Sequence, residues 1–564
     1  MENLDETTGL LEQTPDTTEQ DALEQEYHEH NLSLPKLPIV LSLWLGSFLS
    51  SLDGTIVANI MNRVAEEFQE SDKKQWIATS YLLTNTAFQP LYGKLSDLTG
   101  RKFAVLTAHF FFGLGCLLTC FANSVTQFAI ARAICGVGGG GINAMSSITV
   151  SDICTQRERG IYQGYANIVF GLGQILGAPI GGLFIDTLGW RILFGLQVPT
   201  ILLCSSLVHK NVNIKLSHLL PVEERFKWSN LSRIDILGSS TLVFTISGVL
   251  FLCSTELNKA LLSIFTVISF IAFILIELYY SKERIMPFEL LKGSFGLASA
   301  ATVISSFIIF GDIFRSPIYL QLIQGVSVTK TGFFMLFPSI SVAVGSLATG
   351  WILRHTKMKL SHCAYWIVTI GMSIQLLGLV VAYYLIQNLE PSLSGSAIFG
   401  AFVQIGQNIS SQSYTWVVIY ALALILVSFG YACLLVATLV NIVFTIPKSQ
   451  QGTVTGIFYL WRSIGNVLGA SLTLVFYEKG VSSFLWNYMF NKQHDDYNFS
   501  KKEYRKLLSD TSYLRSGHFP DGILFELLKV YRNSFLLSYL PNFILAIAGV
   551  AICGGLLVVS YAQD

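Results

Sequence analysis

The chain has 564 residues, of which 52% are hydrophobic and 13% are charged, whereas a soluble domain carries roughly 25% charged residues. Its 36 Lys and Arg residues balance 36 Asp and Glu residues, and this zero net charge argues against a nucleic-acid partner. The composition excludes an ordinary soluble domain and predicts an all-α membrane protein embedded in the lipid bilayer, because the apolar residues form runs of about 20, the length of a membrane-spanning helix.

The N-terminal tail, residues 1–36, is acidic, polar and poor in aromatic residues, which predicts disorder. Within it, Glu6, Leu10 and Leu11 have the spacing of an acidic dileucine signal, which a cytoplasmic sorting adaptor would bind. No signal peptide is expected, because the N-terminus lacks a basic region and the first apolar run is too long.

Fourteen apolar stretches follow, and we interpret each as a transmembrane helix. Two of them separate two sets of six, which predicts an N-terminal bundle (37–210), a cytoplasmic loop with two inserted helices (211–292) and a C-terminal bundle (293–564). The last of these includes a long luminal loop (478–534) in which amphipathic helices could form a cap. The predicted spans are 38–60, 75–93, 103–122, 126–150, 161–184, 191–209, 234–254, 260–280, 296–322, 332–353, 363–386, 415–446, 451–476 and 534–560.

The basic residues of the short loops predict the orientation of the chain. Seventeen Lys and Arg residues lie on one side of the membrane and six on the other, so the richer side, with both termini, is expected to face the cytosol. The sequons at Asn408 and Asn498 then lie in luminal loops and could be glycosylated, whereas those at Asn31 and Asn230 face the cytosol and are expected to stay unmodified.

Two ionisable residues lie inside the first and fourth spans, where a charged side chain is costly and marks a functional site. Asp53 is either a helix-end carboxylate at the luminal face or a buried carboxylate that binds a proton in one state and a cationic group in another. Arg132 cannot lose its proton, so it extends to the nearer interface, holds an acidic partner ionised, or receives a substrate carboxylate.

The turn between the second and third spans is short, charged and rich in glycine, so it must lie at a membrane surface. Asp97 can pair there with Arg101 or Lys102, while Gly93 and Gly100 let the helix ends approach closely.

The fifth span is rich in small residues. Gly173, Gly177, Gly181 and Gly182 allow a neighbouring helix to pack backbone to backbone, and Pro179 favours a kink.

An internal repeat relates the two sets of six spans. Four glycines of the fifth span region recur in the thirteenth at a constant offset of 292 residues. Repeats of this kind place a substrate site at the interface of the two halves, near the membrane midplane. The recurring glycines are Gly160, Gly164, Gly173 and Gly177, followed by Gly452, Gly456, Gly465 and Gly469.

In the second set of six, Asp312 lies 259 residues after Asp53, and it either takes part in transport or pairs locally with Arg315. Arg462 in the thirteenth span is a weaker candidate for a functional residue than Asp53, Arg132 or Asp312. Glu277 is expected to be solvated at the cytoplasmic interface. The nine cysteines are scattered through apolar runs, so we expect neither a disulfide framework nor a metal site, and no cofactor is indicated.

The turn from Gly93 to Lys102 resembles the loop between helices 2 and 3 of the major facilitator superfamily. Further stretches resemble motifs of the fourteen-span drug:proton antiporter branch, although that branch more often has another residue at Gly54. The resemblance, over about residues 38–480, implies the major facilitator fold. These stretches are Asp53-Gly-Thr-Ile-Val, Arg132 with Gly136, and Gly173 to Gly182.

Within that branch the chain is similar to the fungal vacuolar basic amino acid transporters, on stretches 42–53, 74–80 and 458–469. The resemblance implies a proton-coupled antiporter, not an enzyme, that moves lysine, histidine and arginine from the cytosol into the vacuole. It also implies that Asp53 and Arg132 couple protons to this cationic substrate. Asp97 with Arg101 would latch the cytoplasmic gate.

Three other functions stay open on the sequence. The first is a plasma-membrane exporter of drugs or organic cations, and the second is a siderophore:proton carrier with the same number of spans. The third, from another class, is a non-transporting membrane sensor, which would need a large cytoplasmic signalling extension.

Overall fold

The computed structural model describes most of the chain, and within the described residues the secondary structure is helical, with no strand. Each of the fourteen predicted spans overlaps at least one helix of the described residues. Ten helices of the described part are long and apolar enough to cross a membrane, so the chain is a multi-pass membrane protein. The described residues are 25–27, 29–70, 73, 75–217, 219–227, 230, 235–254, 258–281, 293–392, 411–444, 450–491, 499–509, 511–515 and 517–562.

Long helices account for most of the described residues, and short helical turns extend or connect them. The long helices are α2 (Lys36–Glu67), α3 (Gln75–Thr99), α4 (Arg101–Cys120), α5 (Val125–Ile153), α6 (Gln156–Thr187), α7 (Trp190–Asn211), α10 (Ile236–Ser254), α11 (Lys259–Leu275), α12 (Ser294–Ile318), α14 (Leu336–His355), α15 (Leu360–Asn388), α17 (Ser411–Phe444), α18 (Gln451–Trp486), α20 (Asp521–Ser538) and α21 (Leu540–Ala562). The short ones are α8 (Val222–Arg225), η2 (Ile276–Tyr280), η4 (Tyr319–Ile323), α13 (Val328–Phe334), η6 (Asn487–Asn491), α19 (Lys501–Ser509) and η7 (Thr511–Arg515).

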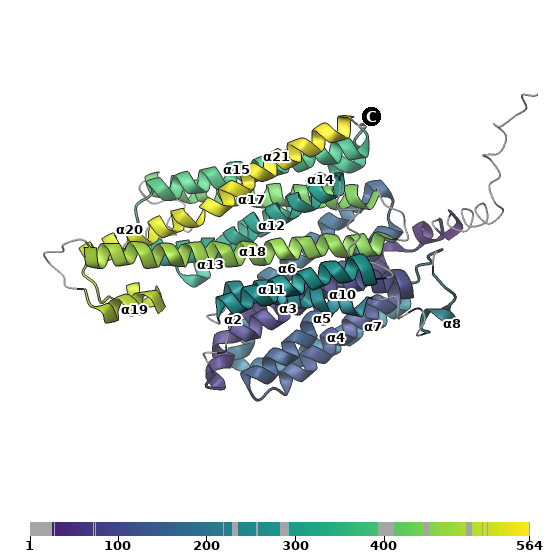
Figure 1. Ribbon diagram of the computed structural model, residues 1–564, viewed down its shortest axis with the longest axis horizontal. Coiled ribbons are helices and arrows are strands. Elements are labelled where there is room, and N and C mark those ends of the chain that lie inside the picture. Colours follow the sequence, from purple (N-terminus) through teal and green to yellow (C-terminus); the bar gives the residue numbers. More distant parts are fainter. Residues whose placement is uncertain are drawn as a thin grey trace, which may run out of the picture.

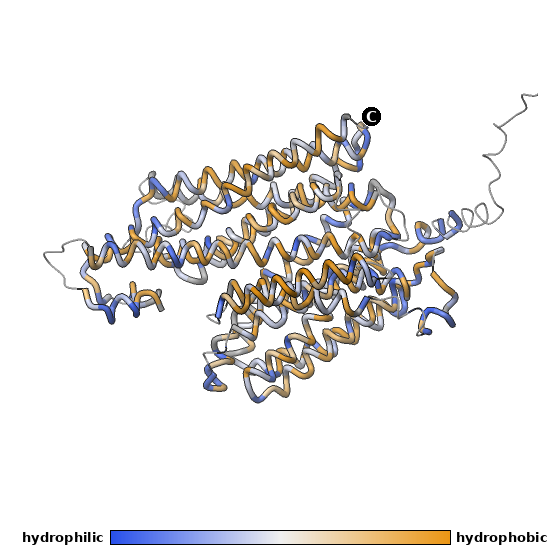
Figure 2. Tube along the Cα trace, in the orientation of Figure 1, coloured by the Kyte–Doolittle hydropathy of each residue, from blue (hydrophilic) through white to orange (hydrophobic). Residues whose placement is uncertain are grey.

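The long helices run roughly side by side, with α2 to α7 on one side and the green and yellow helices of the C-terminal half on the other (Figure 1). We call the end that carries α8 and the C-terminus the linker end, and the opposite end, which carries α13 and α19, the cap end. Orange, hydrophobic stretches follow the length of the helices, while blue, hydrophilic stretches gather at these two ends (Figure 2). This is the pattern of a helical bundle that crosses a bilayer.

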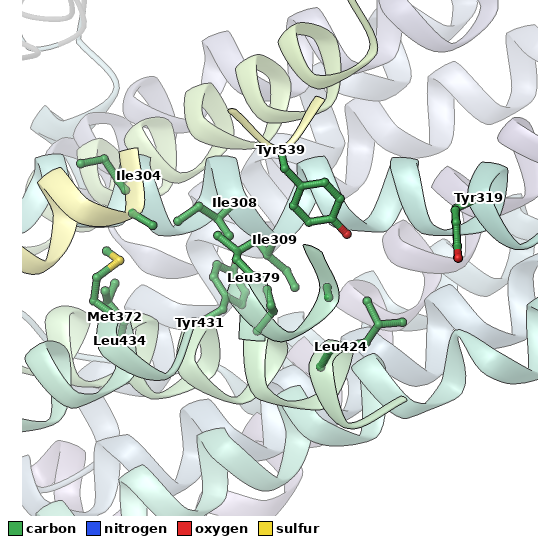
Figure 3. Packing of buried hydrophobic residues seen from close by; sticks show 14 of the residues in the cluster. Ile304, Ile308, Ile309, Tyr319, Met372, Leu379, Leu424, Tyr431, Leu434 and Tyr539 are labelled. Carbon is green, nitrogen blue, oxygen red and sulfur yellow. The ribbon is translucent and has the colours of Figure 1, made fainter. Parts of the chain in front are cut away.

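Each half has its own hydrophobic core. Buried apolar residues between Ile39 and Val212 form one cluster, and a second is drawn mainly from residues between Ala298 and Leu556. In the second, Ile308, Leu379 and Tyr431 bring α12, α15 and α17 together (Figure 3). A small third cluster joins the inserted helices to α3 and α18; its members are Ala87, Leu242, Ile246, Phe273 and Leu460.

The repeated glycines make equivalent helix crossings in the two halves. At the linker end, a Cβ at Gly160 of α6 would lie 2.8 Å from the Cα of Gly350 in α14, and a Cβ at Gly456 of α18 would lie 3.0 Å from the Cα of Pro90 in α3. The halves are therefore in backbone contact across α6–α14 and α3–α18. Asn167 of α6 also donates a hydrogen bond to Ser346 of α14 (2.8 Å).

Replacement of Gly160 by Ala is expected to lower the free energy of unfolding by about 1–3 kcal/mol, because the added methyl group must push two backbones apart. The matched control is Gly171→Ala on the same helix, where a Cβ meets nothing within 4 Å. Thermal unfolding of the two purified variants in detergent measures the difference. Equal melting temperatures would show that the α6–α14 crossing tolerates a wider spacing.

The structure differs from the sequence prediction at the 478–534 loop. Helix α18 continues ten residues beyond the predicted end at residue 476, and α20 begins at Asp521, well before residue 534. Burial explains the difference, since Tyr477 of α18 packs on Phe535 of α20, with ring centroids 4.3 Å apart. The amphipathic α19 lies between these helices in the chain, and its Leu507 is fully buried.

Two further predictions are corrected near the linker end. The part of the 1–36 tail that is described is not disordered throughout: residues 29–33 are helical, and Asn31 exchanges two hydrogen bonds with the backbone of Lys215 (2.7 and 3.0 Å). Glu277, expected to be solvated, is fully buried, because the π-helical turn η2 at the end of α11 packs on α10.

At the cap end, Glu67 ties α2 to α7 outside the apolar part of the helix. It accepts hydrogen bonds from Trp190 Nε1 and Arg191 Nη1, both at 2.7 Å. Burial raises the pKa of Glu67, but the hydrogen bonds from Arg191 and Trp190 outweigh it and leave the pKa below its usual 4.5. The interaction thus stabilises the fold above pH 4.5 and is lost as the pH falls through the lowered pKa.

Glu67→Gln is therefore expected to reduce stability at pH 7 by about 0.5 kcal/mol, a small effect because the pair is half exposed. The difference from the unaltered protein should shrink as the pH falls below 4.5. Melting temperatures at pH 7 and pH 4 measure it, with the exposed neighbour Glu66→Gln as the control. A difference that is equal at both pH values would contradict the assignment.

Candidate functional site

A fully buried ion pair lies in the N-terminal half. Arg132 Nη1 of α5 is 2.8 Å from Asp53 Oδ2 of α2, and neither side chain is exposed. Arg132 therefore does not extend to a membrane interface, because its guanidinium lies against an acidic partner inside the bundle. Asp53 is likewise not a helix-end carboxylate, since it lies in the middle of α2 and is completely enclosed.

The surroundings of the pair leave both the guanidinium and the carboxylate incompletely hydrogen-bonded. The Cζ atom of Arg132 lies 4.4 Å from the ring centroid of Tyr81, a cation–π contact, and Nη1 donates to Cys135 Sγ at 3.5 Å. Arg132 Nε and Nη2 and Asp53 Oδ1 have no hydrogen-bond partner among the residues that the structure describes. The pair is thus enclosed within the helices while one carboxylate oxygen has no hydrogen-bond donor.

The glycines of the fifth span position the turn of α2 that carries Asp53. A Cβ at Gly173 would lie 2.6 Å from Phe48 O, and one at Gly177 would lie 2.6 Å from Leu52 O. Any side chain there would push α6 away from α2. Gly181 has ordinary clearance, 3.5 Å from Ile56 Cα, and α6 is helical through Pro179 and Gly182.

One group of buried side chains near the pair could in principle hold a metal ion. Asp53, Cys116 and Cys135 each present a ligand atom, and these atoms lie within 4.8 Å of one another. The guanidinium of Arg132, however, already lies against the carboxylate and would repel a cation. We therefore assign no metal to this group.

A second network of charges closes the linker end. Arg101 Nη1 donates to Asp97 Oδ1 at 2.7 Å, and Arg101 Nε donates to Asp152 Oδ2 of α5, also at 2.7 Å. The predicted pairing of Asp97 is thus with Arg101 and not with Lys102, whose Nζ donates to Asn213 (3.1 Å). This network ties α3, α4 and α5 together at their ends.

Asp97 also crosses to the other half of the molecule. Its Oδ2 accepts hydrogen bonds from both the backbone N–H and the hydroxyl of Thr453, each at 2.8 Å. Thr453 lies in the first turn of α18, where backbone N–H groups have no partner within the helix and the helix dipole favours a negative charge. Asp97 therefore caps a helix of the opposite half.

Two glycines permit this contact. Gly93 of α3 faces the Gly452 carbonyl so closely that no side chain could fit between the helices. Gly100 has φ +96°, a backbone conformation that favours glycine, and it immediately precedes α4. Asp152 and Thr453 were not identified from the sequence, where only the repeat of Gly452 pointed to this end of α18.

The third candidate, Asp312, forms the predicted local pair. Arg315 donates to Asp312 within α12, and both side chains are buried. Arg315 also donates to Ser538 O (3.1 Å), and its Cζ lies 3.3 Å from the ring centroid of Tyr539, where α20 ends and α21 begins. These contacts hold α12 against the junction of the last two helices.

Several predicted sites lie outside the described residues. They are the sorting signal at Glu6, Leu10 and Leu11 and the sequons at Asn408 and Asn498. They stay predictions.

Comparison with known proteins gives a consistent result. The family model described as Major Facilitator Superfamily matches residues 43–470. The chain is 66% identical to vacuolar basic amino acid transporter 1 of Saccharomyces cerevisiae, over 98% of this chain and 97% of that protein. It is 32% identical to multidrug resistance protein fnx1 of Schizosaccharomyces pombe, over 96% of each chain, and 31% identical to the vacuolar membrane amino acid uptake transporter fnx2 of the same yeast, over 77% of this chain and 71% of that one.

A match over most of the chain to the family model, together with 66% identity along almost the full length, settles the family. The buried ion pair, the charged turn and the repeated glycine crossings described above lie within the matched region. The chain therefore belongs to the major facilitator superfamily of membrane transporters and, within it, to the family of the vacuolar basic amino acid transporters.

Proposed function

We propose that the protein is a proton-coupled antiporter that moves lysine, histidine and arginine from the cytosol into the vacuole. The names of its relatives in two yeasts support the substrate class and the compartment. The single structural observation that carries the proposal is the buried Asp53–Arg132 pair, because a carboxylate shielded from water can exchange one positive group for another.

In the proposed cycle, Asp53 is occupied in turn by a proton and by a cationic group. When it is ionised, it attracts Arg132, which cannot lose its own proton. A proton from the acidic lumen neutralises Asp53 and abolishes that attraction, so α2 and α5 are released from each other. Loss of the proton to the cytosol restores the pair, and the acidity of the vacuole drives the exchange.

The network around Asp97 supplies the gate. With the linker end facing the cytosol, the bonds from Thr453 to Asp97 and the glycine crossings keep the two halves together on that side. The conformation described here is then closed toward the cytosol. Opening requires the hydrogen bonds from Thr453 to Asp97 to break, while the ion pair between Arg101 and Asp97 stays intact.

The test is ATP-dependent uptake of radiolabelled lysine, histidine and arginine into vacuolar vesicles with and without this protein. We expect uptake that depends on the protein and is abolished when the proton gradient is collapsed. Equal uptake in both preparations would reject the amino acid substrates. The similarity to a protein named for multidrug resistance then makes export of a cationic dye the next assay.

A further inference from the structure

Arg462 of α18 lies at the junction of the two halves. Its neighbour Ser463 donates to Gln89 Oε1 of α3 at 3.0 Å, so that side of α18 faces the N-terminal half. A Cβ at Gly465 would lie 2.8 Å from the Cβ of Ser306 in α12, so a second side faces the C-terminal half. Successive side chains of an α-helix are rotated by about 100° around its axis, so the side chain of Arg462 points between the directions of Ser463 and Gly465.

The guanidinium of Arg462 is held on one edge only. Its Nε donates to the hydroxyl of Tyr431 in α17 at 2.9 Å, and its Cζ lies 5.8 Å from the ring centroid of Tyr459. Among the described residues no carboxylate lies within 4.0 Å of it, whereas Arg101, Arg132 and Arg315 each have one. Its side chain is also partly exposed, unlike those three.

An arginine within a membrane helix requires an anion or an equivalent acceptor. The hydrogen bond to Tyr431 uses Nε and leaves the two terminal nitrogens without a hydrogen-bond partner among the described residues. Two parallel N–H groups of a guanidinium match the two oxygens of a carboxylate. The missing anion is therefore one that arrives with the substrate.

Asn466 lies one helical turn further along α18, on the same side as Arg462. It is partly exposed, and its Oδ1 accepts no hydrogen bond from a described residue although that atom is shielded from solvent. An amide oxygen is an acceptor for an ammonium group. Arg462 and Asn466 together thus present one donor and one acceptor for a zwitterion.

We propose that Arg462 binds the α-carboxylate of the transported amino acid and that Asn466 accepts a hydrogen bond from its α-ammonium. This inference rests on the proposed function and adds the part of the substrate that distinguishes an amino acid from other organic cations. Arg462 thus takes the place of Arg132 as the group that receives the substrate carboxylate, because the guanidinium of Arg132 is buried and paired with Asp53.

The experiment compares L-arginine with agmatine, which has the same guanidinium side chain but no carboxylate. Apparent Kd values come from ligand-dependent thermal stabilisation of the purified full-length protein. The unaltered protein should bind arginine about tenfold to hundredfold more tightly than agmatine, as expected for a charge-assisted hydrogen-bonded pair. In Arg462→Gln this preference should disappear, while Arg462→Lys should retain part of it.

The matched control is Arg505→Gln, which removes an exposed arginine of α19 and should leave the preference unchanged. Equal binding of arginine and agmatine by the unaltered protein would overturn the inference even if Arg462→Gln failed to fold. If folded Arg462→Gln kept the full preference for arginine over agmatine, the inference would also be overturned. Failure of the proposed function is recognised separately, since arginine uptake into vacuolar vesicles would then not depend on the protein.

Discussion

Replacement of Asp53 by Asn is expected to reduce proton-driven arginine uptake to the level of vesicles without the protein. Asparagine keeps the size of the side chain but cannot take up and release a proton. The variant also leaves Arg132 as a buried, unpaired cation, which costs about 3–5 kcal/mol of stability. Uptake into vacuolar vesicles must therefore be normalised to the amount of protein in the membrane.

A double variant separates the loss of coupling from the loss of stability. In Asp53→Asn with Arg132→Gln, both charges are removed and the two amides can hydrogen-bond, so stability should recover while uptake stays absent. Asp521→Asn, an exposed aspartate of α20, is the matched control and should transport normally. Proton-driven uptake by the double variant would move the coupling group elsewhere, and Asp312 would be tested next.

Replacement of Asp97 by Asn is expected to open the linker end. The carboxylate caps α18 through two hydrogen bonds from Thr453, and losing their charge-assisted part costs about 3 kcal/mol, roughly a hundredfold change in the equilibrium between closed and open forms. The asparagine amide also brings an N–H group toward the N–H of Thr453. Uptake should fall, because the transporter no longer closes on the cytosolic side.

The opening is measured with a cysteine placed at Ser463, on the junction side of α18, and a membrane-impermeant thiol reagent added to the cytosolic face of vesicles. Labelling should increase at least several-fold in Asp97→Asn. Protein without the introduced cysteine gives the background, which is low because most native cysteines of the described part are buried. Thr453→Ser retains both donors and should label like the parent; unchanged labelling in Asp97→Asn would show that other contacts close this end.

The sequence was sufficient for the features that depend on local pattern. Each of the fourteen predicted apolar runs overlaps a helix of the described residues, and the pairing of Asp97 with Arg101 was accessible because only four positions separate them across a short turn. The superfamily and the transporter class, as opposed to an enzyme, were also correctly predicted. The apolar runs and the charged turn each depend on residues that are close together in the sequence.

Contacts between distant segments were less accessible. Asp53 and Arg132 could each be recognised because a charge within a span is costly, but their pairing was one of several alternatives until the fold brought α2 and α5 together. Thr453 is 356 residues from Asp97 and has no unusual chemistry of its own. The ends of α18 and α20 were missed because mutual burial, and not composition, determines them.

The most direct test of the central claim uses purified protein in liposomes with an acidic interior and a pH-sensitive dye inside. Addition of external arginine should make the interior more alkaline in step with arginine uptake, and Asp53→Asn should show neither change. Arginine accumulation without any accompanying proton movement, or a full proton response in Asp53→Asn, would contradict the alternating occupation of that carboxylate.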